Sequence, residues 1–284
     1  MKSATGIAVR DTILWVDDTG EADLPPILCL HSLFLDGRMF DALVPAAKGR
    51  FRVIRPDFRG QGSSAPSTDA LVTMDCCADD MIALIETLAL PPVHLIAASM
   101  GGDVAVRIAA RRPDLCASMV MMGSSARGEP EDQKGNFTDL LDRTRAIGFV
   151  GDDLDMMMSI MFGATTRSKP EKQAMIEHWR THIGRLAPST WAAMVGVVER
   201  PSAVSLLPRV KAPTLVYLSD EDIARPQEWT HEVADNIPGA TLQRLEAVGH
   251  SPILEIPDIV IPQTLDFMAG AQRALRTQPA HTGA

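Results

Sequence analysis

The chain has 284 residues, enough for one large domain with an insertion or for two small ones, and 46% of its residues are hydrophobic, which is typical of a globular protein. Its formal net charge of −9 argues against nucleic acid or an anionic membrane surface as a partner. No apolar run is long enough to span a bilayer, and the first residues lack the apolar core of a signal peptide. The sequence therefore predicts a cytoplasmic protein that binds neither membrane nor nucleic acid, and it does not specify an oligomeric state.

Short apolar segments alternate with amphipathic ones along most of the chain. The stretch GIAVRDTILWV, residues 6–16, predicts two strands with a tight turn near Arg10 and Asp11. Further apolar runs suit strands buried on both faces, and they lie at residues 26–30, 51–57, 93–97, 118–123, 214–220 and 241–246. Helical spacing is seen at residues 78–90 and 101–112. This alternation predicts an α/β fold, with a doubly wound, mainly parallel sheet and helices on both faces.

The alternation is interrupted between about Arg127 and Pro208. This stretch contains helical patterns at residues 152–162, 170–186 and 190–200 and no convincing strand. An insertion of this kind is most simply a cap over the strand ends, where ligands of such sheets bind. We therefore expect a core of residues 1–126 and 207–272, a helical cap of residues 127–206, and a flexible tail of residues 273–284.

The stretch LIAASMGG, residues 95–102, places a serine between a predicted buried strand and a predicted helix. A nucleophilic serine on a sharp strand-to-helix turn is usually flanked by glycines, because the two backbones nearly touch there. Gly101 fits this pattern, and Ala97 departs from it by one methyl group. Ser99 is therefore a candidate nucleophile, although serine also commonly caps helices.

A nucleophilic serine needs a base and an orienting carboxylate, which follow it in chain order as acid and then histidine in this geometry. Asp220, Glu221 and Asp222 come directly after the predicted strand at 214–220, and His250 follows the last predicted strand. The carboxyl ends of parallel strands share one edge of the sheet, so these residues are expected near Ser99. Five other histidines fit less well: His94 lies in a predicted strand, His231 in a predicted helix, His178 and His182 in the cap, and His281 in the tail.

The developing oxyanion of such a reaction needs two backbone N–H donors. The amide after the nucleophile belongs to Met100. The loop LHSLFLD, residues 30–36, follows the first parallel strand and supplies a second amide, most plausibly that of Leu33.

These motifs resemble those of the α/β-hydrolase fold superfamily over residues 5–270. The resemblance rests on LHSL, RPDFRGQGSS, AASMGG, DED and GHSPILEIP, and aligning LSDED on the family's acid motif selects Asp222, with Asp220 as the alternative. Residues 31–64 are similar to the 3-oxoadipate enol-lactonases. Phe40 stands in place of their tryptophan, His31 in place of their asparagine, and Ala97 in place of the first glycine of the elbow.

The resemblance implies a serine hydrolase that cleaves a small carboxylic ester or lactone through a Ser99–His250–Asp222 triad and an acyl-enzyme, without a metal or other cofactor. A C–C bond hydrolase and a cofactor-free peroxidase or perhydrolase use the same triad and stay open as alternatives. A binding protein that keeps the scaffold without turnover is a third reading, against which the intact triad weighs.

Four residues are candidates for contacts with the substrate. An anionic lactone calls for an arginine, and Arg38 continues the oxyanion loop. The methionine-rich run DMMMSIMF, residues 155–162, contains Met157 and Met161, which together with Trp191 would form an adaptable apolar pocket wall. Two cap arginines are further candidates, Arg143 and Arg145, although an exposed, solvated side chain is the simpler interpretation for each of the three arginines.

Overall fold

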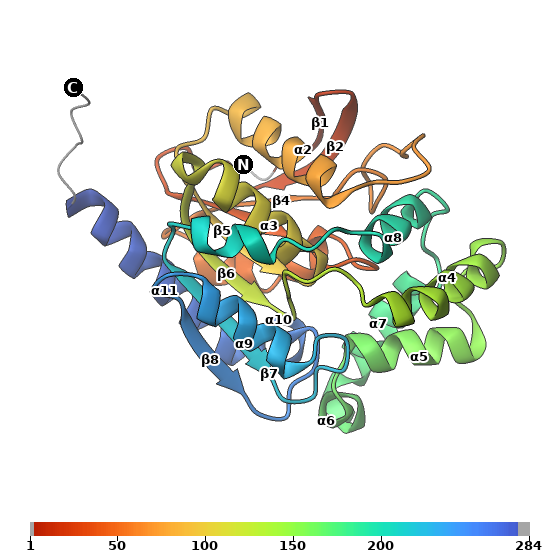
Figure 1. Cartoon of the computed structure of the whole chain (residues 1–284). Coiled ribbons are helices and arrows are strands. Elements are labelled where there is room, and N and C mark those ends of the chain that lie inside the picture. The colour runs from red at the N-terminus through yellow and green to blue at the C-terminus, as the bar shows by residue number, and fades with distance from the viewer. Residues whose placement is uncertain (1–2, 278–284) are drawn as a thin grey trace.

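The computed structural model describes residues 3–277, which form a twisted sheet covered by helices on both faces (Figure 1). The sheet has eight strands in the order β1-β2-β4-β3-β5-β6-β7-β8. In chain order these are β1 Ser3–Val9, β2 Thr12–Asp18, β3 Pro26–Leu30, β4 Arg52–Pro56, β5 Val93–Ala98, β6 Cys116–Met122, β7 Thr214–Ser219 and β8 Thr241–Leu245.

Pairing within the sheet is antiparallel for β1 with β2 and for β2 with β4, and parallel for every later pair. Strands β3, β5, β6 and β7 are buried along their whole length, which explains why their sequences are continuous apolar runs rather than alternating ones. The predicted doubly wound, mainly parallel sheet is therefore confirmed.

Two groups of helices cover the two faces of the sheet. Helix α2 (Met74–Thr87) packs against α3 (Met100–Arg111), and the 3₁₀ helix η4 (Val204–Arg209) contacts both α3 and α9 (Gln227–Asn236). On the other face, α1 (Leu43–Ala47) packs against α11 (Pro257–Thr277). The elements of the core are η1 Gly37–Phe40, α1 Leu43–Ala47, α2 Met74–Thr87, α3 Met100–Arg111, η2 Pro113–Leu115, η4 Val204–Arg209, α9 Gln227–Asn236, α10 Pro252–Glu255 and α11 Pro257–Thr277.

Between β6 and β7 the chain forms the helices gathered on one side of the sheet in Figure 1, and we call residues 127–206 the cap. They are α4 Glu131–Arg145, α5 Gly151–Met161, α6 Ala164–Ser168, η3 Pro170–Lys172, α7 Gln173–Ile183 and α8 Thr190–Val198. Helix α4 was not predicted, because its sequence is polar and contains Gly135. It is held by burial of Leu140 and Leu141 and by packing against α8.

The end of the chain departs from the predicted flexible tail. Helix α11 continues through Thr277, so residues 273–277 are helical, and residues 278–284 lie outside the described part of the chain. The predicted boundary at residue 206 falls inside η4, which packs against α3 and α9 of the core. Among the helices of residues 3–277, none has the length and apolar character needed to cross a membrane.

His94 of β5 makes the stability of the fold depend on pH. Its buried ring bonds the Ser118 hydroxyl at 2.7 Å and the Gln272 side chain at 2.9 Å, and burial lowers its pKa from 6.5 to about 4. The unfolded chain therefore takes up a proton that the folded chain refuses between pH 6.5 and pH 4. The contribution of the neutral His94 ring to the free energy of unfolding is complete above this window and is lost as the pH falls through it.

We expect the free energy of unfolding of the wild type to fall by about 3 kcal/mol more than that of His94→Gln between pH 7 and pH 4. Urea unfolding at the two pH values measures this difference. The exposed His231 supplies the control, since His231→Gln should keep the wild-type pH dependence. Equal losses in the wild type and His94→Gln would contradict the prediction.

Candidate active site

Ser99 occupies a sharp turn between β5 and α3. Its backbone has a φ of 51° and a ψ of −116°, a strained combination for a residue with a side chain. Its N–H donates to the Met122 carbonyl at 3.0 Å, which ties the turn to the end of the neighbouring strand β6. A Cβ atom at position 101 would lie 2.2 Å from the Leu30 carbonyl oxygen, so only glycine fits there. Ala97 is fully buried within β5, and the extra methyl group is accommodated.

The His250 ring lies at the same edge of the sheet, bonded to Asp222. The imidazole Nδ1 is 3.0 Å from each carboxylate oxygen of Asp222, and both side chains are buried. The backbone N–H groups of Ala224 and Arg225 donate to Asp222 Oδ1 and fix the carboxylate further. Asp220, the alternative acid, is bonded instead to the exposed Arg244 at 2.8 and 3.0 Å.

The environment of Asp222 favours its ionised form. Burial acts to raise the pKa of Asp222. The charge and hydrogen bond of His250, together with the charge and backbone N–H of Arg225, outweigh burial and hold that pKa below its ordinary value. An ionised carboxylate on Nδ1 fixes the imidazole with its other nitrogen, Nε2, available for proton transfer.

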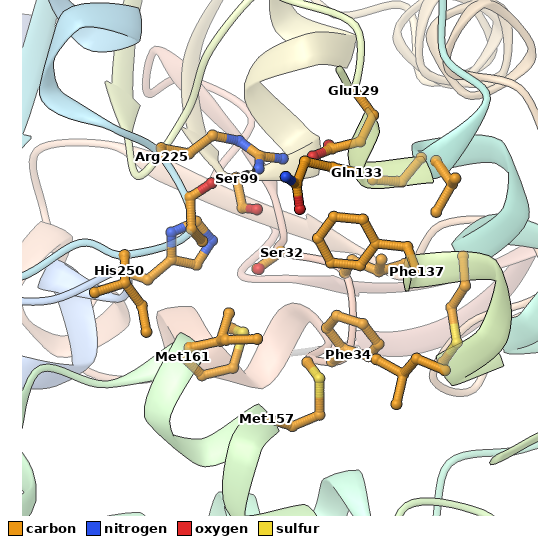
Figure 2. A pocket seen from close by; sticks show the side chains of 18 of the residues that line it. Ser32, Phe34, Ser99, Glu129, Gln133, Phe137, Met157, Met161, Arg225 and His250 are labelled. Atoms are coloured by element: carbon orange, nitrogen blue, oxygen red, sulfur yellow. Dashed lines mark hydrogen bonds between the residues drawn. The ribbon is translucent and has the colours of Figure 1, made fainter. Parts of the chain in front are cut away.

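Ser99 and His250 line one cavity of about 560 Å³ between the strand ends and the cap (Figure 2). The His250 ring packs against Gly123, where a Cβ atom would lie 3.0 Å from Nδ1. Gly123 directly follows Met122, the residue that accepts the Ser99 N–H. The predicted serine, histidine and acid are therefore brought together at the ends of β5, β7 and β8.

The loop after β3 borders the same cavity through Ser32, Leu33 and Phe34. The N–H groups of Leu33 and Met100, the two predicted oxyanion donors, make no hydrogen bond to another group of residues 3–277. The buried Ser32 hydroxyl is also without a partner among these residues. His31 holds the loop in place, because its Nε2 accepts from the Phe58 N–H at 2.9 Å, leaving Nδ1 to donate to the Ser32 carbonyl at 2.8 Å.

A buried carboxylate, Glu255, fixes the loop that carries His250. It accepts from the N–H groups on both sides of the histidine, those of Gly249 and Ser251, each at 3.0 Å. It also accepts from the cap, from Gly163 N–H at 3.0 Å and the Thr166 hydroxyl at 2.6 Å. Glu255 thus joins the cap to the histidine loop. It lies in the motif GHSPILEIP, but its partners are backbone groups that the sequence does not identify.

The cavity walls are mainly apolar, and they include Met157 and Met161 as predicted candidates. Trp191 does not line the cavity, which corrects the prediction for this residue. Its indole stacks on Phe149 with centroids 5.8 Å apart, and its N–H donates at 3.3 Å to the carbonyl of Leu141, which does line the cavity. Walls that the sequence did not single out include Phe34, Phe137, Leu140, Ile160, Met194 and Val197.

None of the three arginine candidates lines the cavity, which corrects the candidate role of Arg38. Arg38 lies outside the cavity, because Asp36 binds its guanidinium at 2.6–3.0 Å beside His182. Arg143 pairs with Asp153 on the surface, and Arg145 is exposed. The arginine that lines the cavity is Arg225. Its signal was present in DEDIARP, since it follows the acid by one turn and belongs to the same edge of the sheet.

Comparison with known proteins agrees with this architecture. The family model of the alpha/beta hydrolase fold matches residues 25–257. Among solved structures, a thermophilic esterase from Thermogutta terrifontis with malate bound is 30% identical, with a TM-score of 0.84 over 95% of this chain and 99% of that one. The enol-lactonase from Burkholderia xenovorans LB400 is 25% identical, with a TM-score of 0.84 over 93% and 100%.

By sequence, the chain is also 28% identical to the magnesium-chelatase 30 kDa subunit of Rhodobacter capsulatus, over 90% of this chain and 91% of that protein. The names of these relatives thus extend beyond esterases and lactonases. The family match covers most of the chain and the whole arrangement of strands around Ser99. The chain belongs to the alpha/beta hydrolase fold family, as the motifs of its sequence indicated.

Proposed function

We propose that the protein is a serine hydrolase of small carboxylic esters or lactones, with Ser99 as nucleophile, His250 as base and Asp222 as orienting acid. The observation that carries the proposal is the pair of 3.0 Å contacts between the Asp222 carboxylate and His250 Nδ1, at the edge of a cavity that Ser99 also lines. The similarity to an esterase and to an enol-lactonase supports ester or lactone chemistry in particular.

In the proposed reaction, Ser99 Oγ attacks the carbonyl carbon while His250 Nε2 takes the hydroxyl proton. The N–H groups of Leu33 and Met100 stabilise the oxyanion, each contributing about 3 kcal/mol. His250 then gives the proton to the leaving oxygen as the C–O bond breaks, which leaves an acyl group on Ser99. Water, deprotonated by His250, attacks the acyl carbon, and the acid is released as Ser99 recovers its proton.

A fluorophosphonate probe tests the nucleophile directly, because it labels only an activated serine. We expect labelling of the wild type and complete loss of labelling in Ser99→Ala, detected by intact mass. The matched control is Ser168→Ala, which removes an exposed cap serine and should leave labelling unchanged. Labelling of folded Ser99→Ala at the wild-type rate would overturn the assignment.

Substrate panels distinguish the chemistries that share this triad. Short aryl esters and enol-lactones represent the proposed reaction, and a vinylogous diketone represents C–C bond cleavage. Faster turnover of the diketone than of any ester or lactone would replace the proposed reaction with C–C hydrolysis.

A further inference from the structure

One charged side chain of the cavity has no role in the reaction proposed above. Arg225 is only 8% exposed, and among residues 3–277 its guanidinium makes one hydrogen bond, from Nη1 to the Ala224 carbonyl at 2.8 Å. Its Nε is buried without an acceptor in that part of the chain. No carboxylate of those residues approaches its nitrogens within the 4.0 Å of an ion pair. A buried guanidinium in this state lacks the partner that usually compensates its desolvation.

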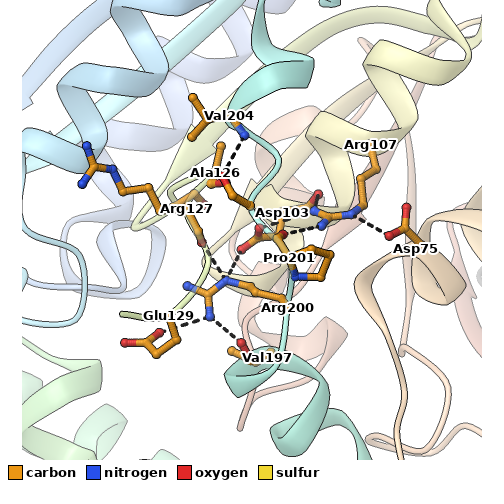
Figure 3. Close-up of polar contacts among 12 residues, drawn as sticks. Asp75, Asp103, Arg107, Ala126, Arg127, Glu129, Val197, Arg200, Pro201 and Val204 are labelled. Carbon is orange, nitrogen blue, oxygen red and sulfur yellow. Dashed lines mark hydrogen bonds and ion pairs between the residues drawn. The ribbon is translucent and has the colours of Figure 1, made fainter. Parts of the chain in front are cut away.

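The nearby carboxylates are engaged by other arginines (Figure 3). Asp103 lies 3.4 Å from Arg107 and 3.3 Å from Arg200, and Glu129 lies 3.2 Å from Arg200. Asp222 is held by His250. Burial lowers the pKa of Arg225, and the charge of Arg200 lowers it further, although Asp103, Glu129 and Asp222 act in the opposite direction. Asp75 also pairs with Arg107, at 3.4 Å, so each of these carboxylates is bound by Arg107 or Arg200, and Arg225 is left without a direct ion-pair partner among residues 3–277.

The guanidinium of Arg225 lies in the cavity where a substrate of Ser99 would bind. It shares the cavity with Ser99, and Figure 2 shows its guanidinium extending past Ser99 toward Glu129 and Gln133. The part of the cavity away from Arg225 is lined by apolar side chains, those of Phe34, Met157 and Met161. Two further acids that line the cavity, Asp132 and Glu228, are exposed, so water screens their charges. The interior thus combines an apolar end with a single free cation beside the nucleophile, within the described residues.

We propose, on the basis of the hydrolase function above, that Arg225 binds a carboxylate of the substrate, so that the preferred substrates are esters or lactones bearing a free carboxylate group. A carboxylate that reaches the Nη1–Nη2 end of the guanidinium accepts two parallel hydrogen bonds, and this bidentate geometry is specific to arginine. The apolar part of the same substrate then lies against the phenylalanine and methionine side chains.

The experiment compares paired substrates that differ in one charge. One pair is the p-nitrophenyl half-ester of glutaric acid and the p-nitrophenyl ester of pentanoic acid. A second pair, carboxymethyl butyrate and ethyl butyrate, carries the charge in the alcohol. For at least one pair, the wild-type ratio of kcat/KM, charged over neutral, should exceed 1 and should fall by about 30-fold or more in Arg225→Met. The ratio for Arg225→Lys should lie between those of the wild type and Arg225→Met, because lysine keeps the positive charge but cannot form the bidentate hydrogen bonds.

The matched control is Arg143→Met, a surface arginine of the cap that should keep the wild-type ratios. Unchanged ratios in folded Arg225→Met would overturn the inference while leaving the hydrolase function intact. Absence of turnover of all four esters by the wild type would instead overturn the proposed function itself. If Arg225→Met does not fold, the kcat/KM ratios of the wild type alone test the inference. A higher kcat/KM for the neutral ester in both pairs would refute a carboxylate site.

Discussion

Replacing Asp222 with asparagine is expected to lower kcat by roughly 10³–10⁴-fold, equivalent to about 4–5.5 kcal/mol of transition-state stabilisation. The amide keeps the shape of the carboxylate but loses its charge, and its NH₂ group offers a donor where Nδ1 needs an acceptor. The imidazole then adopts the wrong tautomer, and the imidazolium formed during proton transfer is not stabilised. Steady-state hydrolysis of a p-nitrophenyl ester measures the loss, with thermal unfolding as a check that the variant folds.

Asp220 provides a closely matched control, because it lies two residues away at the end of the same strand. Its carboxylate is bonded to the exposed Arg244 and not to the histidine. Asp220→Asn should therefore retain kcat within about threefold, as expected for a surface ion pair. A larger loss in Asp220→Asn than in Asp222→Asn would exchange the roles of the two aspartates.

Removing the carboxylate of Glu255 is expected to destabilise the protein by roughly 4 kcal/mol, because Glu255→Ala leaves three buried backbone N–H groups without an acceptor. Glu255→Gln should lower the free energy of unfolding by less, since the amide oxygen still accepts hydrogen bonds while the amide NH₂ faces one of the N–H donors. Both variants should also lose kcat in the folded state, because the donors flank His250. Urea unfolding and ester hydrolysis below the unfolding transition measure the two effects.

Glu221 supplies the comparison for this experiment. It too joins the core to the cap, accepting from the Thr165 N–H at 2.8 Å, but it is only partly buried and its carboxylate makes no hydrogen bond to the histidine loop. Glu221→Gln should cost about 1 kcal/mol and leave kcat close to that of the wild type. If Glu221→Gln lowers kcat as much as Glu255→Gln, the special position of Glu255 beside His250 is refuted.

The sheet was predictable because its physical cause is local. Strands buried on both faces must be apolar throughout, so β3 has the bounds of the apolar run at residues 26–30, and β5, β6 and β7 coincide closely with their runs. The run at residues 241–246 also forms a strand, but β8 is an edge strand and is exposed over most of its length, so the expected burial on both faces is wrong there. Helix α4 escaped prediction because only a few of its side chains contact the rest of the protein. The helical end of the chain escaped for the same reason, since residues 273–277 are stabilised by continuation of α11 rather than by an apolar pattern of their own.

The strand-end residues of the site were predictable from the order of the strands, whereas the pocket was not. Ser99, Asp222 and His250 follow parallel strands, so the topology alone assigns them to one edge. Whether Arg38, Trp191 and Arg225 line the pocket depends on the direction of each side chain. That direction is set by contacts that the local sequence pattern does not reveal. Asp36 draws Arg38 away and Phe149 stacks with Trp191, while the turn that binds Asp222 directs Arg225 into the cavity.

The close contact between cap and core at Gly163 and Gly249 constrains how the cavity exchanges molecules with solvent. A Cβ atom on Gly249 would lie 2.1 Å from the Gly163 nitrogen, so the two backbones touch, and Glu255 is bonded to both. An outward rotation of the cap as a rigid body would break these bonds and displace the loop that carries His250. The cavity is open to solvent instead at lining side chains that are exposed, among them Gln133 and Ile223, so exchange with solvent there requires no separation of Gly163 from Gly249.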